Sequence, residues 1–264
     1  MEAESIPVYA SPMPAIRKIE LDRPWQWLVK GWRDMRSAPL VSYTYGVLAA
    51  LTGYVLTFGL ALADMLYLVL PMMAGFLIVG PVLTVGLYEI SRRAELGEST
   101  TLMQALQSFN RNASQIALVG VALMLLMFAW ARLAALIFFL YFGLQPPSFE
   151  NLIVSTFLQA DTLPFLVFGT LIGGALALLA FAISAVSIPL LLDHPEANVV
   201  DAMATSFRTV QTNFLPMLFW GGLIVVFTAA GIATLYLGLI VTLPLIGHAS
   251  WHAYRDLVSF PEHG

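Results

Sequence analysis

The sequence contains no cysteine and few charged residues. Without cysteine, the 264-residue chain has no disulfide, iron–sulfur or thiolate chemistry, and cysteine usage gives no information about its redox compartment. Charged residues make up 11% of the chain, compared with about 25% in soluble domains. The formal net charge of −4 also disfavours nucleic acid as a partner, because binding nucleic acid requires a strong basic patch.

In place of charge the chain has long apolar blocks. Hydrophobic residues make up 59% of it, and stretches of about 18 or more such residues are typical of transmembrane helices. The blocks cover residues 40–63, 65–90, 115–144, 163–192 and 214–253. At about 1.5 Å per residue the last block is twice as long as one crossing requires, so we predict two spans with a turn within residues 231–238. The expected fold is an all-α polytopic membrane protein with six transmembrane helices.

The chain is expected to consist of three parts. Residues 1–23 are expected to form a flexible N-terminal segment, and they lack the apolar core of a cleaved signal peptide. Residues 24–258 are expected to form one six-helix domain, followed by a tail at residues 259–264.

The basic residues predict the orientation. Eleven of the twelve fall on one side of the predicted membrane: Arg17, Lys18, Arg23, Lys30, Arg33, Arg36, Arg92, Arg93, Arg111, Arg208 and Arg255. The opposite loops carry only Asp64, Glu150 and Asp161. Because cytoplasmic loops are enriched in Lys and Arg, we expect a bacterial inner-membrane protein with both termini in the cytoplasm.

Three similar units are predicted, at about residues 24–93, 98–192 and 195–256. Each begins with an amphipathic segment expected to lie along the membrane surface, followed by a transmembrane hairpin. Aromatic residues on these segments are expected to anchor them at the interface: Trp25, Trp32, Phe109 and Phe207. In the third unit, Asp193 and Glu196 have capping-box spacing and predict a helix start. The alternative is that unrelated helices meet the same constraints at a membrane surface.

The stretch "GHASWHAYRD" places His248 and His252 four residues apart, on one face of a helix. Such a pair can bind a metal ion, or one histidine can ligate haem. The favoured interpretation is that the pair marks a membrane exit, with hydrogen bonds to Asp201, Glu89 or headgroup phosphates and with Trp251 as an interfacial anchor. We therefore expect no cofactor and no metal, with haem or metal at the pair as the alternative.

One basic residue, Arg132, lies within an apolar block. A charge at mid-bilayer costs about 3 kcal/mol or more, so the side chain should pair or extend to the interface. Its depth predicts a place near the outer surface, within reach of Asp64 or Asp161. Glu89 is interpreted in the same way at the inner surface, as a structural polar group.

Two glycines predict close helix packing. Gly169 and Gly173 form a GxxxG pattern, which allows helices to approach within the bundle or at a partner. Prolines recur in comparable places near Pro81, Pro189 and Pro244, and helix breaks of this kind can build transport sites.

Several stretches resemble a known family. With "SRRAELGE" and above all "PLIGHASWHAYRDLV", the chain resembles the bacterial integral-membrane family named domain of unknown function 2189, over about residues 25–258. The resemblance implies no chemistry, because no activity is established for that family. Some members are labelled cytochrome c oxidase subunits, which implies at most a respiratory partner. A haem–copper catalytic subunit needs several histidines on neighbouring spans, and here only His248 and His252 lie inside one.

The sequence contains no nucleophile elbow, phosphate loop, metalloprotease helix or carboxylate dyad. An enzyme is therefore the less favoured class, although it stays open. We expect a non-enzymatic scaffold or an accessory subunit of a larger inner-membrane assembly, such as a respiratory complex. The alternative is a transporter of small molecules or lipids.

Overall fold

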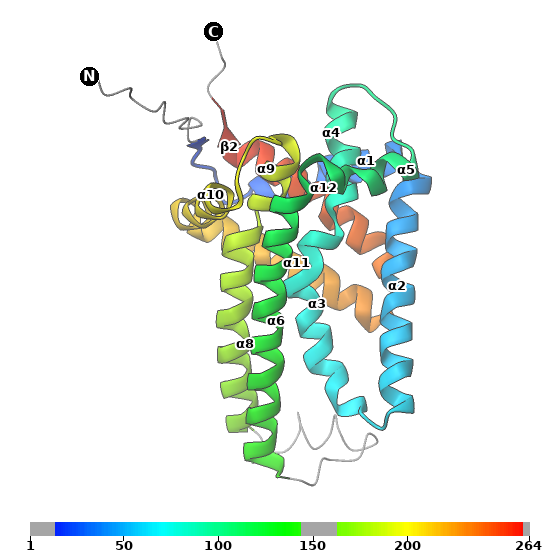
Figure 1. Cartoon of the computed structure of the whole chain (residues 1–264), viewed down its shortest axis with the longest axis vertical. Helices are drawn as coiled ribbons and strands as arrows, with labels where there is room; N and C mark the ends of the chain where they lie inside the picture. The colour runs from blue at the N-terminus through cyan, green and yellow to red at the C-terminus, as the bar shows by residue number, and fades with distance from the viewer. Residues whose placement is uncertain (1–13, 144–162, 261–264) are drawn as a thin grey trace, which may run out of the picture.

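The computed structural model describes residues 14–143 and 163–260 (Figure 1). Its helices are α1 (Arg23–Ser37), α2 (Pro39–Leu62), α3 (Val69–Leu83), α4 (Val85–Glu95), α5 (Leu102–Gln107), α6 (Ala113–Phe142), α8 (Leu163–Ser184), α9 (Ser187–Asp193), α10 (Val199–Thr212), α11 (Phe214–Ala233) and α12 (Leu239–Leu257). Two 3-10 helices, η1 (Leu66–Leu68) and η2 (Ser108–Asn112), and two short strands, β1 (Ala15–Ile16) and β2 (Val258–Ser259), complete the described elements. Glu150 and Asp161 of the predicted opposite loops lie outside the described residues.

Five stretches of the described chain are long and apolar enough to cross a membrane. They are Pro39–Leu62, Pro71–Glu95, Leu102–Phe142, Leu163–Asp193 and Phe214–Ala233. This confirms a helical membrane protein and agrees with the first five predicted spans. The predicted sixth span, α12, is not among them, because its second half contains His248, His252, Arg255 and Asp256.

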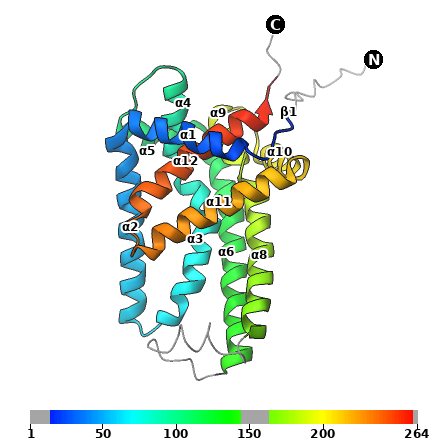
Figure 2. The ribbon, with the colours of Figure 1, turned by 180° about the vertical axis from the view of Figure 1, so that it is seen from behind.

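The helices form an upright group and a layer across one end of it. Helices α2, α3, α6 and α8 run roughly parallel to the long axis of the molecule, while α1, α5 and α10 lie across the end where the described chain begins and finishes (Figure 1). Helices α11 and α12 run obliquely and form a hairpin beside α2 (Figure 2). We call α1, α4, α5, η2, α9, α10 and the second half of α12 the terminal layer.

Helix α12 is the centre of the terminal layer, packed against α1, α2, α4 and α11. Glycines make these contacts close. A Cβ atom at Gly31 of α1 would lie 2.7 Å from the Ala249 backbone nitrogen, and one at Gly46 of α2 would lie 2.3 Å from the Ile240 carbonyl oxygen. Any larger residue at either position would push α12 away from its neighbour.

The two ends of the domain are tied together by a short antiparallel pair, in which Ala15 lies opposite Ser259 and Ile16 opposite Val258. The Asn213 side chain accepts a hydrogen bond from the Ile19 backbone amide and donates one to the Arg17 carbonyl oxygen. These contacts hold the last part of the predicted flexible segment in place. The sequence did not reveal this, because two strands of two residues leave no periodicity that a sequence pattern can detect.

The start of α10 also differs from the prediction. Helix α9 ends at Asp193, and α10 begins after Asn198, whose side chain accepts a hydrogen bond from the Asp201 amide. The prediction of a helix start at Asp193 is wrong, because its carboxylate binds α12 and not the amides of a new helix.

Candidate functional site

His248 and His252 lie one turn apart on α12, and both are buried in the terminal layer. Small residues surround them on the helix. At Gly247, a Cβ atom would lie 2.5 Å from the Leu87 side chain of α4, and Ala249 touches α1 at Gly31. The small residues let α1 and α4 close over the two imidazoles, so the histidines occupy an interior site.

His248 sits between two serine hydroxyls. Its Nε2 atom lies 2.9 Å from Ser42 Oγ of α2, and its Nδ1 atom lies 2.8 Å from Ser91 Oγ of α4. A neutral imidazole donates through one nitrogen and accepts at the other, so one serine accepts a hydrogen bond and the other donates. A serine donating to histidine is also the arrangement of an activated nucleophile. All three side chains are fully buried, so no substrate reaches the pair in this conformation.

His252 faces carboxylates. Its Nε2 atom lies 2.7 Å from Asp34 Oδ2 of α1, and its Nδ1 atom lies 3.8 Å from Glu95 Oε1 at the end of α4. Glu95 also pairs with Arg255, at 3.1 Å. His252 therefore connects α12 to α1 and α4.

Asp193 adds a contact from α9. Its Oδ2 atom accepts a hydrogen bond from the Tyr254 hydroxyl at 2.9 Å and from Arg255 Nη1 at 3.3 Å. The Arg255 guanidinium thus bridges Asp193 and Glu95. The end of α12 is held from three sides.

Asp256 pairs with α1. Its carboxylate accepts two hydrogen bonds from Arg23, at 2.7 and 2.9 Å, and one from Trp27 Nε1 at 3.0 Å. Burial by itself would raise the pKa of Asp256, but the hydrogen bonds from Arg23 and Trp27 outweigh it and lower that pKa below its ordinary value. The hydrogen bond to Asp256 correspondingly raises the pKa of Arg23.

The predicted partners of the histidines are wrong. Glu89 is buried and accepts hydrogen bonds from Arg92 Nε at 2.7 Å and Arg93 Nε at 2.8 Å on its own helix. Asp201 pairs with Asn198 at the start of α10. The actual partners come from α1, α2 and α4, more than 150 residues away in sequence, where no local pattern points to them.

Arg132 is exposed on α6 and has no ion pair or hydrogen bond to another of the described residues. The predicted pairing with Asp64 is therefore wrong. Asp64 lies in the turn after α2, where its φ is 56°. The other predicted partner, Asp161, lies outside the described residues. An extension of Arg132 to the outer interface stays a prediction.

Four of the five predicted interfacial anchors reach the surface of the terminal layer. Trp25, Trp32 and Phe207 are exposed, and Phe109 is half-buried. Trp251 is fully buried, with its ring centroid 5.4 Å from that of Tyr254. Its prediction as an anchor is wrong, because the side chain belongs to the main hydrophobic core and has no exposed surface.

The GxxxG pair is divided between two environments. A Cβ atom at Gly173 would lie 2.7 Å from the Trp130 ring of α6, so this glycine allows α6 and α8 to pack. At Gly169 nothing lies within 4 Å. Among the residues that the structure describes, only the second glycine makes a close helix contact.

For a metal ion, the described residues contain no group of three or more His, Cys, Asp or Glu side chains suitable as ligands. Both ring nitrogens of His248 already face serine hydroxyls, and Nε2 of His252 faces Asp34. A metal or haem at His248, or at Nε2 of His252, would have to replace one of these hydrogen bonds, whereas Nδ1 of His252 has only Glu95 nearby, at 3.8 Å.

A second candidate site is a pocket at the other end of α12. It lies between α2, α3 and the turn that joins α11 to α12, and it encloses about 440 Å3 that is continuous with the surroundings. The lining is mainly apolar, and its polar groups come from Thr52, Thr57 and Tyr236. Neither Thr57 nor Tyr236 stands out in the sequence.

Comparison with known proteins finds one family model that matches part of the chain. The family model described as a predicted integral membrane protein, domain of unknown function 2189, matches residues 67–193, from η1 to the end of α9. The resemblance seen in the sequence is thereby confirmed for that region. No curated protein and no solved structure gives a significant match.

Proposed function

We propose that this integral membrane protein, a member of that family over residues 67–193, is a non-enzymatic scaffold or accessory subunit of a larger membrane assembly, such as a respiratory complex. The observation that carries the proposal is a contrast. The histidines and several buried carboxylates of the terminal layer bind partners within the protein, while the long helices expose apolar side chains.

The fixed part is the terminal layer. Glu89, Asp193 and Asp256 each accept hydrogen bonds from at least two partners, and His248 is enclosed by two serines. Groups satisfied in this way rigidify a structure and offer little to a substrate. This supports a structural role for the layer.

The exposed apolar surface of the long helices is clearest on α2. Only 11% of the most apolar stretch of α2 is buried, compared with 56% for the stretch formed by α8 and α9. Val55, Phe58 and Leu62 are all strongly exposed. Helices in a membrane associate through van der Waals packing, and a span with so few contacts is suited to a partner helix.

The proposal includes the location and the repeat. We place the protein in the bacterial inner membrane with the terminal layer on the cytoplasmic side, on the strength of its basic residues. The order of elements supports three units: α1 before α2 and α3–α4, α5 before α6 and α8–α9, and α10 before α11 and α12. Cytoplasm-dependent reporters fused after Arg93 or Gly264 should be active, and one fused at Phe149 should be silent.

The scaffold role is tested by cross-linking in native membranes. The chain has no cysteine, so Val55→Cys and Phe58→Cys introduce single reactive sites on one face of α2. Leu171→Cys on α8 is the control, because Leu171 is also strongly exposed. We expect the same discrete protein adduct from both α2 positions and none from Leu171→Cys. No adduct from α2, or an adduct with a second copy of the chain, would contradict an accessory role.

A second candidate, handling of lipid, is favoured by the pocket beside α2. A transporter of polar solutes needs polar groups free to bind its substrate, whereas the Thr57 and Tyr236 hydroxyls bind each other at 2.6 Å. The lining is therefore better matched to hydrocarbon than to a polar solute.

A further inference from the structure

The turn between α11 and α12, residues 234–238, lies beside the second half of α2 (Figure 2). The Tyr236 hydroxyl lies 2.6 Å from Thr57 Oγ1, and the Tyr236 ring packs against Tyr54, with ring centroids 5.4 Å apart. Thr57 precedes the end of α2 at Leu62 by five residues, or about 7 Å at 1.5 Å per residue. The hairpin therefore turns back before it reaches the far end of the neighbouring span.

The composition of this turn suits hydrocarbon. Its sequence is Thr-Leu-Tyr-Leu-Gly, and its exposed side chains are Thr234 and the two leucines, Leu235 at 72% and Leu237 at 58%. Non-helical backbone inside a bilayer requires internal partners for its polar groups. The amides of Thr234, Tyr236 and Leu237 donate to backbone carbonyls, and the Gly238 amide donates to Thr234 Oγ1 at 2.8 Å. Four of the five amides of the turn thus have a partner within the protein.

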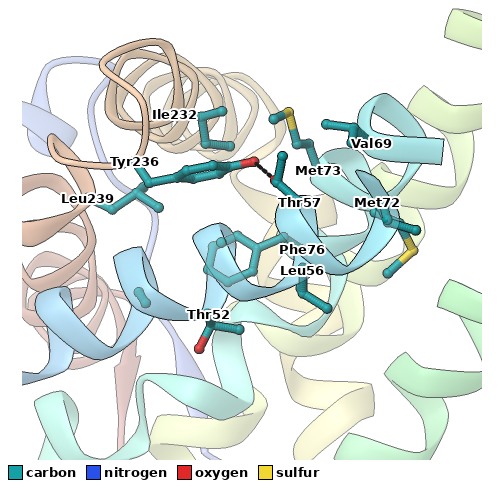
Figure 3. Close-up of a pocket in the computed structure, with 13 residues that line it drawn as sticks. Thr52, Leu56, Thr57, Val69, Met72, Met73, Phe76, Ile232, Tyr236 and Leu239 are labelled. Atoms are coloured by element: carbon teal, nitrogen blue, oxygen red, sulfur yellow. Dashed lines mark hydrogen bonds between the residues drawn. The ribbon is translucent and has the colours of Figure 1, made fainter. Parts of the chain in front are cut away.

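The same turn forms one wall of the pocket. Tyr236, Ile232 and Leu239 face Met73 and Phe76 of α3 across it, and the Tyr236–Thr57 hydrogen bond closes one side (Figure 3). Tyr236 adopts a positive φ of 66°, which is uncommon for a bulky residue. Gly53 lets its ring lie flat on α2, since a Cβ atom there would come within 2.5 Å of the ring. These features hold the wall in one position.

We infer that the α11–α12 hairpin enters the bilayer and returns to the same side, and that the pocket at its tip binds the acyl chain of a membrane lipid. Thr52 and Leu56 are exposed and also line the pocket, so its mouth opens on the lipid-facing surface of α2. Met72 and Met73 supply flexible side chains that adapt to a mobile chain.

The depth of the turn is tested with single cysteines in reconstituted vesicles, with a membrane-impermeant maleimide present on both sides. Leu237→Cys should stay unreacted until the protein is denatured in detergent. Asp64→Cys, in the exposed turn after α2, should react at once and serves as the control. If Leu237→Cys reacts as readily as Asp64→Cys, the hairpin crosses the membrane and the inference is overturned.

The pocket is tested with a phospholipid that carries a diazirine in the middle of its acyl chain, added in trace amount to phosphatidylglycerol and phosphatidylethanolamine vesicles containing the full-length protein. Photolabelling should concentrate on Met72 and Met73. Leu56→Trp fills the mouth and should reduce that labelling several-fold. Val55→Trp, next to it on α2 but outside the pocket, should not.

Equal labelling of Met72 and Met73 in the two variants, or labelling spread evenly over all exposed helices, would mean that lipid only surrounds the protein and that no acyl chain occupies the pocket. Size-exclusion profiles of both tryptophan variants establish that they fold. A lipid pocket does not require a scaffold role, so the cross-linking result from α2 and the labelling result can fail separately.

Discussion

His252 Nε2 lies 2.7 Å from Asp34 Oδ2 and joins the last helix of the chain to the first. Both side chains are largely buried, so the pair is shielded from solvent. The contact bridges 218 positions in sequence and, with Arg23–Asp256, fastens α1 across α12. Its energetic contribution can be measured directly.

We expect Asp34→Asn or His252→Gln to lower the free energy of unfolding by about 1.5–3 kcal/mol, the range for hydrogen bonds that involve a charged group. Thermal denaturation in detergent micelles measures the change. The double variant should lose less than the sum of the two single variants, because they remove the same contact. Fully additive losses would mean that the two side chains do not interact in solution.

Replacing His248 by Leu should destabilise the protein by about 1–3 kcal/mol for each buried hydroxyl left unpaired at Ser42 and Ser91. Further change of both serines to alanine should recover part of the loss, since the partners are then apolar as well. Recovery is read from the denaturation midpoint, and no recovery would speak against the serine contacts.

Acid should weaken the attachment of α1 to α12. Because the pKa of Asp256 is lowered in the folded protein, its contribution to stability is present above the ordinary aspartate value of about 3.9 and is lost as the pH falls below it. Asp256→Asn should flatten the fall of the denaturation midpoint on the acid side. Asp22→Asn, at an exposed position whose side chain makes no capping hydrogen bond, should keep the wild-type slope.

Gly46→Ala should destabilise the protein by about 1–3 kcal/mol, the typical cost of overpacking, because the new methyl group would meet the Ile240 backbone. Gly59→Ala on the same helix is the matched control, since nothing lies within 4 Å of it. Alanine is the better helix former, so the control should be neutral or more stable by about 0.5–1 kcal/mol. Equal tolerance at both positions would contradict the close approach of α2 and α12.

Much of the helical framework follows from the sequence. The predicted blocks 40–63 and 115–144 agree with Pro39–Leu62 and Ala113–Phe142 within about two residues at each end, and the predicted turn at 231–238 contains the observed one. A transmembrane helix is a local property, because its length is set by the thickness of the hydrocarbon layer and its backbone bonds are internal. The family resemblance likewise required only residues read in order.

The interior of the terminal layer could be known only from the tertiary structure. Nothing local in "GHASWHAYRD" shows that His248 lies between Ser42 and Ser91 or that Trp251 is buried. Nor does it show that Tyr254 donates a hydrogen bond to Asp193. An apolar or aromatic residue near a helix end can pack against lipid or against another helix, because both surroundings are apolar. The sequence therefore does not distinguish the two environments. The glycines at positions 31, 46 and 247 allow α1, α2 and α4 to pack closely against α12. The two histidines, which the sequence suggested for a membrane exit, therefore lie in a packed polar core.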